Sequence, residues 1–349
     1  MDTSAKDFLR DLISKISPSG FEDDAVRLWE QRMRLYTKDT HIDVNGNGIA
    51  RLGKGTGPKI MLAAHIDEIG YMVKYISKEG YLYFAPIGGI DYHIIPGQRV
   101  WLKTGKGIVL GVIGRKPVHL VESQERDKVS KIEQMFIDIG VDSEKKAKKI
   151  VAIGDCAVPA VGLEFINDAT IIGRGFDDKI GVFVMCETIR EISKKKLHCE
   201  VCGVATVQEE IGLRGVRPAA YDLAPDVAIV LEVAFATDVP EIDKRKVGDI
   251  KIGGGPVICR GPNVNPKLFK AAVETAEKEK IPYQIEGVER ATGTDANVIQ
   301  LTRSGVPSML ITVPNRYMHT PIELVNVRDV AQTVRLTTAV IERISARGF

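Results

Sequence analysis

Histidine and carboxylate residues follow directly after several apolar runs of this 349-residue sequence. The runs end, in chain order, at His65 and Asp67, at Asp177 and Asp178, at Glu209 and Glu210, at Glu232, and at His319. In open α/β sheets, functional groups collect beyond the carboxyl ends of the strands, so these segments can converge on one crevice. Two imidazoles with several carboxylates, and no cysteine among them, favour a divalent metal in a hydrolytic site.

Each of these residues also has an ordinary structural explanation when it is taken alone. A histidine at a strand end is commonly hydrogen-bonded or solvent-exposed, and Asp177-Asp178 suits the N-cap of a following helix. The pair Glu209-Glu210 suits a solvated strand end before Gly212. Five such groups at five strand ends are harder to explain as caps and turns, which favours the metal site.

The four remaining histidines carry weaker signals. His41 repeats the H-x-D pattern of His65, but it precedes the turn sequence Asn-Gly-Asn-Gly and is interpreted as structural. His93 and His198 have no carboxylate context that selects them. His119 stays open, since it falls in a segment that can reach the cleft.

Apolar and helical patterns alternate over the first third and the last half of the chain, which is typical of an α/β fold. The run at residues 59–64 is almost wholly apolar and predicts a strand covered on both faces. Helical spacing predicts helices over 8–16, 178–192, 266–276 and 327–336. We expect a mixed, mostly parallel sheet between helix layers.

The segment from about residue 70 to 163 differs, because short strands alternate with glycines there. Strands are predicted at 80–85, 98–103 and 107–114, and the charged stretch 123–149 is interpreted as a solvated helix. We therefore expect two domains, one formed by 1–69 and 164–349 and the other a small β-rich domain of 70–163 inserted into it.

Composition excludes several classes of function. The net charge is only +2, so nucleic acid and anionic membranes are not predicted as partners. No run approaches 18 consecutive apolar residues and the start lacks a signal-peptide pattern, which predicts a cytoplasmic protein. The odd count of five cysteines favours reduced thiols, and the Cys199–Cys202 pair lacks the second pair of a zinc knuckle.

Six ordered motifs resemble those of the tetrahedral-particle aminopeptidases, which are cocatalytic di-metal exopeptidases. The motifs are AAHIDEIGYMV, GRGFDDKIGV, VQEEIGLRGV, EVAFATDVP, RATGTDAN and NRYMHTPIELV, and the resemblance spans essentially the whole chain. It implies a di-zinc exopeptidase-like fold, with the inserted domain used for dimerisation and a dodecamer built from dimers. It also implies two divalent ions per subunit, with zinc as the first choice and cobalt as the alternative.

The resemblance also implies roles for particular residues. Asp177 bridges both metals. His65 and Glu232 are the other ligands of one metal, and Glu210 and His319 are the other ligands of the second. Glu209 is the general base and Asp67 orients His65. Related sequences often have Asp at position 232, so the extra methylene of Glu232 bears on metal choice or affinity.

The chemistry of peptide hydrolysis is consistent with these roles, because one unligated carboxylate must take the proton of the attacking water. Neighbouring residues on a strand point in different directions, which gives Glu209 and Glu210 distinct functions. The predicted activity is release of N-terminal residues from peptides. A related di-metal deacylase or carboxypeptidase and a catalytically inactive metal-binding scaffold remain alternatives. A glycosidase is disfavoured, since its two carboxyls must face each other across a sugar.

The sequence leaves the preferred N-terminal residue open, since family members differ in this preference. We expect the segment Thr292–Ala296 to line the selecting pocket and the loop Gly88–Asp91 to lie nearby.

Overall fold

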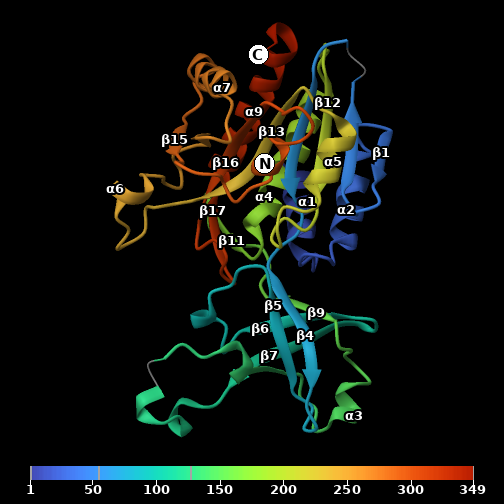
Figure 1. Ribbon diagram of the computed structural model, residues 1–349, viewed down its shortest axis with the longest axis vertical. Coiled ribbons are helices and arrows are strands. Elements are labelled where there is room, and N and C mark those ends of the chain that lie inside the picture. The colour runs from blue at the N-terminus through green and yellow to red at the C-terminus, as the bar shows by residue number, and fades with distance from the viewer. Residues whose placement is uncertain (1, 54–55, 126–127, 349) are drawn as a thin grey trace.

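The computed structural model describes residues 2–53, 56–125 and 128–348 and contains a large α/β domain and a small β-barrel, which lie at opposite ends of an elongated molecule (Figure 1). The barrel emerges from the α/β domain after β3 (Lys59–His65) and returns to it before β10 (Glu164–Asn167). This arrangement confirms an α/β fold with a small inserted β-rich domain. The boundaries at 69/70 and 163/164 stay a prediction.

The α/β domain is built on an 11-stranded mixed sheet whose main path runs β1-β2-β12-β3-β13-β16-β17-β11-β10. Its other strands are β1 (Asp39–Ile42), β2 (Gly48–Leu52), β11 (Thr170–Gly173), β12 (Glu200–Thr206), β13 (Val227–Phe235), β14 (Val257–Arg260), β15 (Gln284–Gly287), β16 (Ser308–Arg316) and β17 (Glu323–Asn326). The central strands β12, β3, β13 and β16 are parallel to one another. Almost every residue in these four strands is buried, as the apolar run at 59–64 predicts for a sheet covered on both faces.

Helices pack against this sheet and supply its core. They are α1 (Thr3–Ser14), α2 (Asp23–Met33), α4 (Phe176–Ile192), α5 (Val216–Leu223), α7 (Pro266–Lys278), α8 (Ala296–Ile299) and α9 (Val327–Arg347). The single-turn helix α6 (Lys244–Val247) stands away from the sheet and buries no residue (Figure 1). Helix α4 packs on β3 and β13 and contacts α1, α2 and α9. Helices α7 and α9 begin at asparagine N-caps, since Asn265 accepts the amide of Lys267 and Asn326 accepts the amide of Arg328. The helices predicted from residue spacing are therefore present.

The inserted domain is a closed antiparallel barrel with the strand order β4-β5-β8-β7-β6-β9. Its strands are β4 (Gly70–Ile76), β5 (Leu82–Ile87), β6 (Arg99–Thr104), β7 (Gly107–Arg115), β8 (Met135–Asp138) and β9 (Cys156–Pro159). Buried side chains from these strands form a separate core, which includes Tyr71, Val100 and Ile137. Closure leaves the barrel without free strand edges.

The interpretation of 123–149 as one solvated helix is wrong. The segment contains the short 3₁₀ turns η3 (Ser123–Glu125) and η4 (Ile132–Gln134), then β8, then the single-turn helix α3 (Glu144–Ala147). Met135 and Ile137 are fully buried, because alternate residues of β8 point into the barrel. A period of two over four residues is too short to outweigh the helical spacing of the whole stretch.

The state of the cysteines and the character of the helices can be compared with what the composition predicts. All five cysteines are free and buried. Within the described ranges, no helix combines the length and the apolar character needed to cross a membrane.

Candidate metal centre

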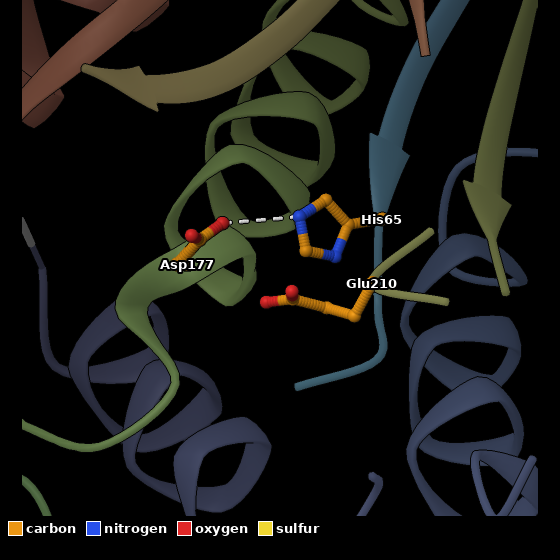
Figure 2. A group of neighbouring side chains, drawn as sticks. All are labelled: His65, Asp177 and Glu210. Atoms are coloured by element: carbon orange, nitrogen blue, oxygen red, sulfur yellow. Dashed lines mark hydrogen bonds and ion pairs between the residues drawn. The ribbon is translucent and has the colours of Figure 1, made fainter. Parts of the chain in front are cut away.

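The side chains of His65, Asp177 and Glu210 converge at the carboxyl end of the central parallel strands (Figure 2). His65 is the last residue of β3 and lies beside Thr206, the last residue of β12, in the parallel register. Asp177 lies in the first turn of α4, where its backbone is not yet helical. Strand ends and a helix start therefore place these groups together, as the topology of an open sheet predicts.

Asp177 lies between the two histidines and presents a different oxygen to each. Its Oδ1 is 3.0 Å from Nε2 of His65, and its Oδ2 is 3.2 Å from Nε2 of His319. His319 follows β16 and has a left-handed backbone with φ 61°. Each oxygen of Asp177 therefore contacts a different histidine.

Each histidine has a further carboxylate beside it. Oε1 of Glu232 is 3.6 Å from Nε2 of His65, and Oε2 of Glu210 is 3.5 Å from Nε2 of His319. The structure thus brings together all five residues for which the sequence predicts metal binding, and Asp177 contacts both histidines. The metal-type groupings differ from the predicted ligand sets, because they place Glu210 with His65 and Asp177 and place Glu232 with His65 and Asp178. His319 belongs to neither grouping. Glu232 reaches His65 from within β13 despite its extra methylene.

The side chains of Glu209 and Glu210 point in different directions. The prediction that this follows from alternation along a strand is wrong. Strand β12 ends at Thr206, so neither glutamate belongs to a strand. They lie in a turn that follows Gln208, whose φ is 57°, and the carbonyl of Glu209 accepts the amides of Gly212 and Leu213. Glu209 approaches His65 from this turn, with Oε2 3.9 Å from Nε2, whereas Glu210 approaches His319.

Asp67 lies behind the histidine and the two glutamates. Its Oδ1 is 3.5 Å from Nδ1 of His65, and its backbone carbonyl is closer to that nitrogen, at 3.2 Å. The carboxylate also accepts the backbone amides of Glu209 and Glu210, each at 3.1 Å. Asp67 therefore contacts both the imidazole and the turn that carries the glutamates.

Three buried carboxylates without a predicted role in metal binding also approach this site. Asp178 groups with His65 and Glu232, and its Oδ2 has no hydrogen-bond partner among the described residues. Glu323 accepts the backbone amides of Phe176 and Asp177, and so fixes the start of α4. Its only signal in the sequence was its place in the motif around His319.

The third of these carboxylates is Asp295, within the segment expected to line a specificity pocket. Its Oδ2 accepts the hydroxyl of Thr206 at 2.6 Å, and its Oδ1 has no partner in the described chain. It is 1% exposed, so it lies behind the site rather than on an open surface.

A loop of the barrel covers the side of the site near His319. A Cβ atom at Gly89 would lie 3.3 Å from Nδ1 of His319, and one at Gly88 would lie 3.4 Å from Oε2 of Glu210. The expectation that the Gly88–Asp91 loop lies near the site agrees with these distances. Glycines permit this close approach because they have no side chain.

The other four histidines lie apart from this cluster. His41, His93, His119 and His198 are exposed, and the metal-type groupings found among the described residues include none of them. Near His41, Asp43 accepts the amides of Asn45 and Asn47, so that segment is a structural turn.

Burial and mutual repulsion raise the pKa of most carboxyls in the site. Burial, followed by the charge of Glu232, raises the pKa of Glu209 to about 10, although His65 opposes the shift. Burial and Asp177 raise the pKa of Glu210 to about 8. Asp177 is the exception, since hydrogen bonds from His319 and His65 outweigh its burial and lower its pKa.

This crowding of acids fits a site for cations. Within the described parts of the chain, the ion pairs of Asp177, Glu209, Glu210 and Glu232 involve only His65 and His319. The buried Oε1 of Glu210 has no hydrogen-bond partner there either. Oxygen and imidazole donors with unsatisfied buried oxygens are the donor set of divalent metals.

Comparison with known proteins agrees with the fold and identifies the family. Residues 46–336 match the family model described as M42 glutamyl aminopeptidase. A lysyl aminopeptidase of Pyrococcus furiosus is 37% identical, covering 98% of each chain. A TET aminopeptidase structure from Thaumarchaeota archaeon SCGC AB-539-E09 has a TM-score of 0.95 and 36% identity, covering 99% of this chain and 98% of that one. Pyrococcus horikoshii TET1 peptidase, which can assemble into a tetrahedron or a large octahedral shell, has a TM-score of 0.86 and 31% identity, covering 97% and 99%.

Proposed function

We propose residue roles, a substrate class and an assembly from one premise: the chain belongs to the M42 glutamyl aminopeptidase family and is a metal-dependent aminopeptidase. The observation that carries the residue roles is the position of Asp177, with one carboxylate oxygen toward His65 and the other toward His319. A free carboxylate, that of Glu209, lies beside this arrangement.

The residues fit two divalent ions. His65 and Glu232 would hold one, Glu210 and His319 the other, and Asp177 both. Such a pair of ions lowers the pKa of a bound water and polarises the scissile carbonyl. Zinc is the proposed metal and cobalt the alternative, since nitrogen and oxygen ligands accept both. Metal analysis of the purified protein decides between them.

Glu209 is the proposed general base, because two bound cations would favour its ionised form and so counter the raised pKa that burial and Glu232 give its carboxyl. It accepts the proton of the attacking water and delivers it to the leaving amine. Its Oε2 is 3.9 Å from Nε2 of His65, so it reaches the cluster, and the metal-type groupings of the described residues do not include it. Asp67 orients His65 and, through its bonds to the amides of residues 209 and 210, the base itself.

Two alternatives have different requirements. A deacylase or carboxypeptidase does not need a free α-amine on the residue that it releases, whereas an aminopeptidase does. An inactive metal-binding scaffold does not need an additional unligated carboxylate, such as that of Glu209, beside a complete set of metal ligands. A glycosidase needs two carboxyls facing each other, but Glu209 and Glu210 turn toward different histidines.

The test is a panel of aminoacyl anilides with free and with acetylated amines. We expect hydrolysis of the free-amine substrates only, and loss of this activity on chelation with recovery when zinc or cobalt is added. Cleavage of acetylated substrates alone would favour the deacylase. The same panel reveals which N-terminal residue is preferred.

Self-association through the barrel is the second part of the proposal. Ile108, Leu110 and Val112, at alternate positions on β7, are 65%, 55% and 46% exposed. We name this row the β7 face. An exposed apolar row on a barrel strand suits burial against another chain. The tetrahedral assembly of the P. horikoshii relative supports a dodecamer, because tetrahedral rotational symmetry relates twelve copies.

The proposed substrates are short peptides, and the proposed compartment is the cytoplasm. Five buried free thiols are consistent with a reducing compartment.

A further inference from the structure

The turn at residues 17–22, between α1 and α2, contacts the segment that carries Glu209. Glu22 is 6% exposed, and its Oε1 accepts two backbone amides, that of Gly20 at 2.8 Å and that of Gln208 at 3.0 Å. Gln208 immediately precedes Glu209. One carboxylate oxygen therefore joins the N-terminal turn to the turn that bears the base.

A second bond joins the same two segments through Asp67. The hydroxyl of Ser19, which is 5% exposed, donates to Oδ2 of Asp67 at 2.6 Å. The two oxygens of Asp67 accept the amides of Glu209 and Glu210. Ser19 thus restrains the carboxylate that orients both glutamates.

These bonds hold a backbone conformation that is unfavourable by itself. Gln208 has a φ of 57°, in the left-handed region, which costs a residue other than glycine about 1–2 kcal/mol. The three consecutive amides of residues 208–210 all end on carboxylate oxygens, one on Glu22 and two on Asp67. The direction of the Glu209 side chain follows from this restrained backbone.

We infer that Glu22 and Ser19 are positioning residues for the general base Glu209. The inference rests on the proposed role of Glu209. Neither residue belongs to the proposed ligand sets, and Glu22 acts through an amide that its Oε1 accepts. Misplacing a reacting group by about 1 Å costs about 100-fold in rate, so loss of the bonds that Glu22 accepts should lower turnover while leaving the metal ligands in place.

The test compares Glu22→Ala with Glu22→Gln in the full-length metal-loaded protein. The amide of Gln keeps an Oε1 that can accept both backbone amides. We expect Glu22→Ala to lower kcat by about 10- to 100-fold, with KM within about twofold of wild type and bound metal unchanged. Glu22→Gln should restore kcat to within about threefold of wild type, because the acceptor rather than the charge is needed.

The matched control is Asp329→Ala. Asp329 is another buried carboxylate, 1% exposed, which accepts the amides of Gly253 and Gly255. We expect this variant to lower thermal stability with kcat per folded chain unchanged. If Glu22→Ala fails to fold, Ser19→Ala replaces it, and we expect a severalfold loss of kcat in that variant. Its control is Ser14→Ala, which changes an exposed serine of α1.

Three results would overturn the inference: kcat per folded chain of Glu22→Ala equal to wild type, a loss confined to KM or to metal content, or Glu22→Gln as impaired as Glu22→Ala. Failure of the proposed function is distinguishable, because it would appear as full activity in Glu209→Gln whatever Glu22 does.

Discussion

Asp177 occupies the central position at the scale of single residues. Its two oxygens lie near different histidines because Glu323 holds its backbone amide and that of Phe176. The geometry of the site thus depends on a buried carboxylate, Glu323, that contacts the amide of Asp177 and neither histidine.

The pH dependence of stability tests the environment of Glu22. Burial, followed by the charge of Asp67, raises the pKa of Glu22 from 4.5 to about 7. A carboxyl whose pKa is higher in the folded state stabilises it fully below pH 4.5 and loses that contribution as pH rises through 7. We therefore expect Glu22→Gln to gain stability relative to wild type as pH rises from 5.5 to 7.5, by about 2 kcal/mol.

Denaturant midpoints of both proteins, measured across that range with equal metal loading, check this expectation. A difference between the two proteins that does not change with pH would show that the pKa of Glu22 is not raised.

The convergence of the five proposed ligands could be predicted from the sequence, whereas the residues that fix their backbone could not. His65, Asp177, Glu210, Glu232 and His319 each follow an apolar run, and the order of their motifs matches a known family. Ser19, Glu22 and Glu323 act through contacts with backbone amides of distant segments. Such contacts do not depend on the type of residue contacted, so they leave no pattern in one sequence.

At the scale of elements, the barrel loop after β5 is part of the site. Gly89 lies close to His319, because a Cβ atom at this position would be 3.3 Å from Nδ1 of the imidazole. An added side chain would therefore have to displace the imidazole or the loop. The barrel therefore contributes to the environment of the site as well as presenting the β7 face.

Gly89→Ala tests this contact. We expect the added methyl to displace His319, to weaken binding of one metal equivalent and to lower kcat/KM by roughly tenfold, because displaced groups at a reacting centre are costly. Titration with metal and steady-state kinetics measure both effects. Gly105→Ala is the control, because a Cβ at Gly105 meets nothing within 4 Å. Equal kinetics in the two variants would show that the loop does not restrain His319.

The long elements could be predicted from the sequence more accurately than the short ones. Helix α4 and strand β3 have long apolar patterns, and both lie where residue spacing predicts them. Strand β8 has only four residues and lies inside a stretch with helical spacing, so its period of two was hidden. The turn after β12 was missed because the apolar run continues through Val207 beyond the last paired residue, Thr206.

At the scale of the whole molecule, the β7 face is the surface proposed for self-association. Ile108→Asp with Leu110→Asp places two charges on it, which disfavours its burial because desolvating a charge is costly. We expect wild type to form a particle of about twelve times the 38.3 kDa chain mass, and the double variant to form smaller species.

Light scattering coupled to size exclusion measures these masses. Leu35→Asp is the control, since Leu35 is 68% exposed at the end of α2 in the other domain. A monomeric wild type, or an undiminished particle from the double variant, would exclude assembly through the β7 face.

Glu209→Gln tests the central claim most directly, because it removes the proposed base while keeping its size and its backbone amide. The measurement pairs kcat on a free-amine aminoacyl anilide with the number of metal ions bound per chain in the same sample. The account predicts two ions per chain, as in wild type, with kcat lowered by about 10²- to 10⁴-fold. Turnover at the wild-type rate with both ions bound would contradict it.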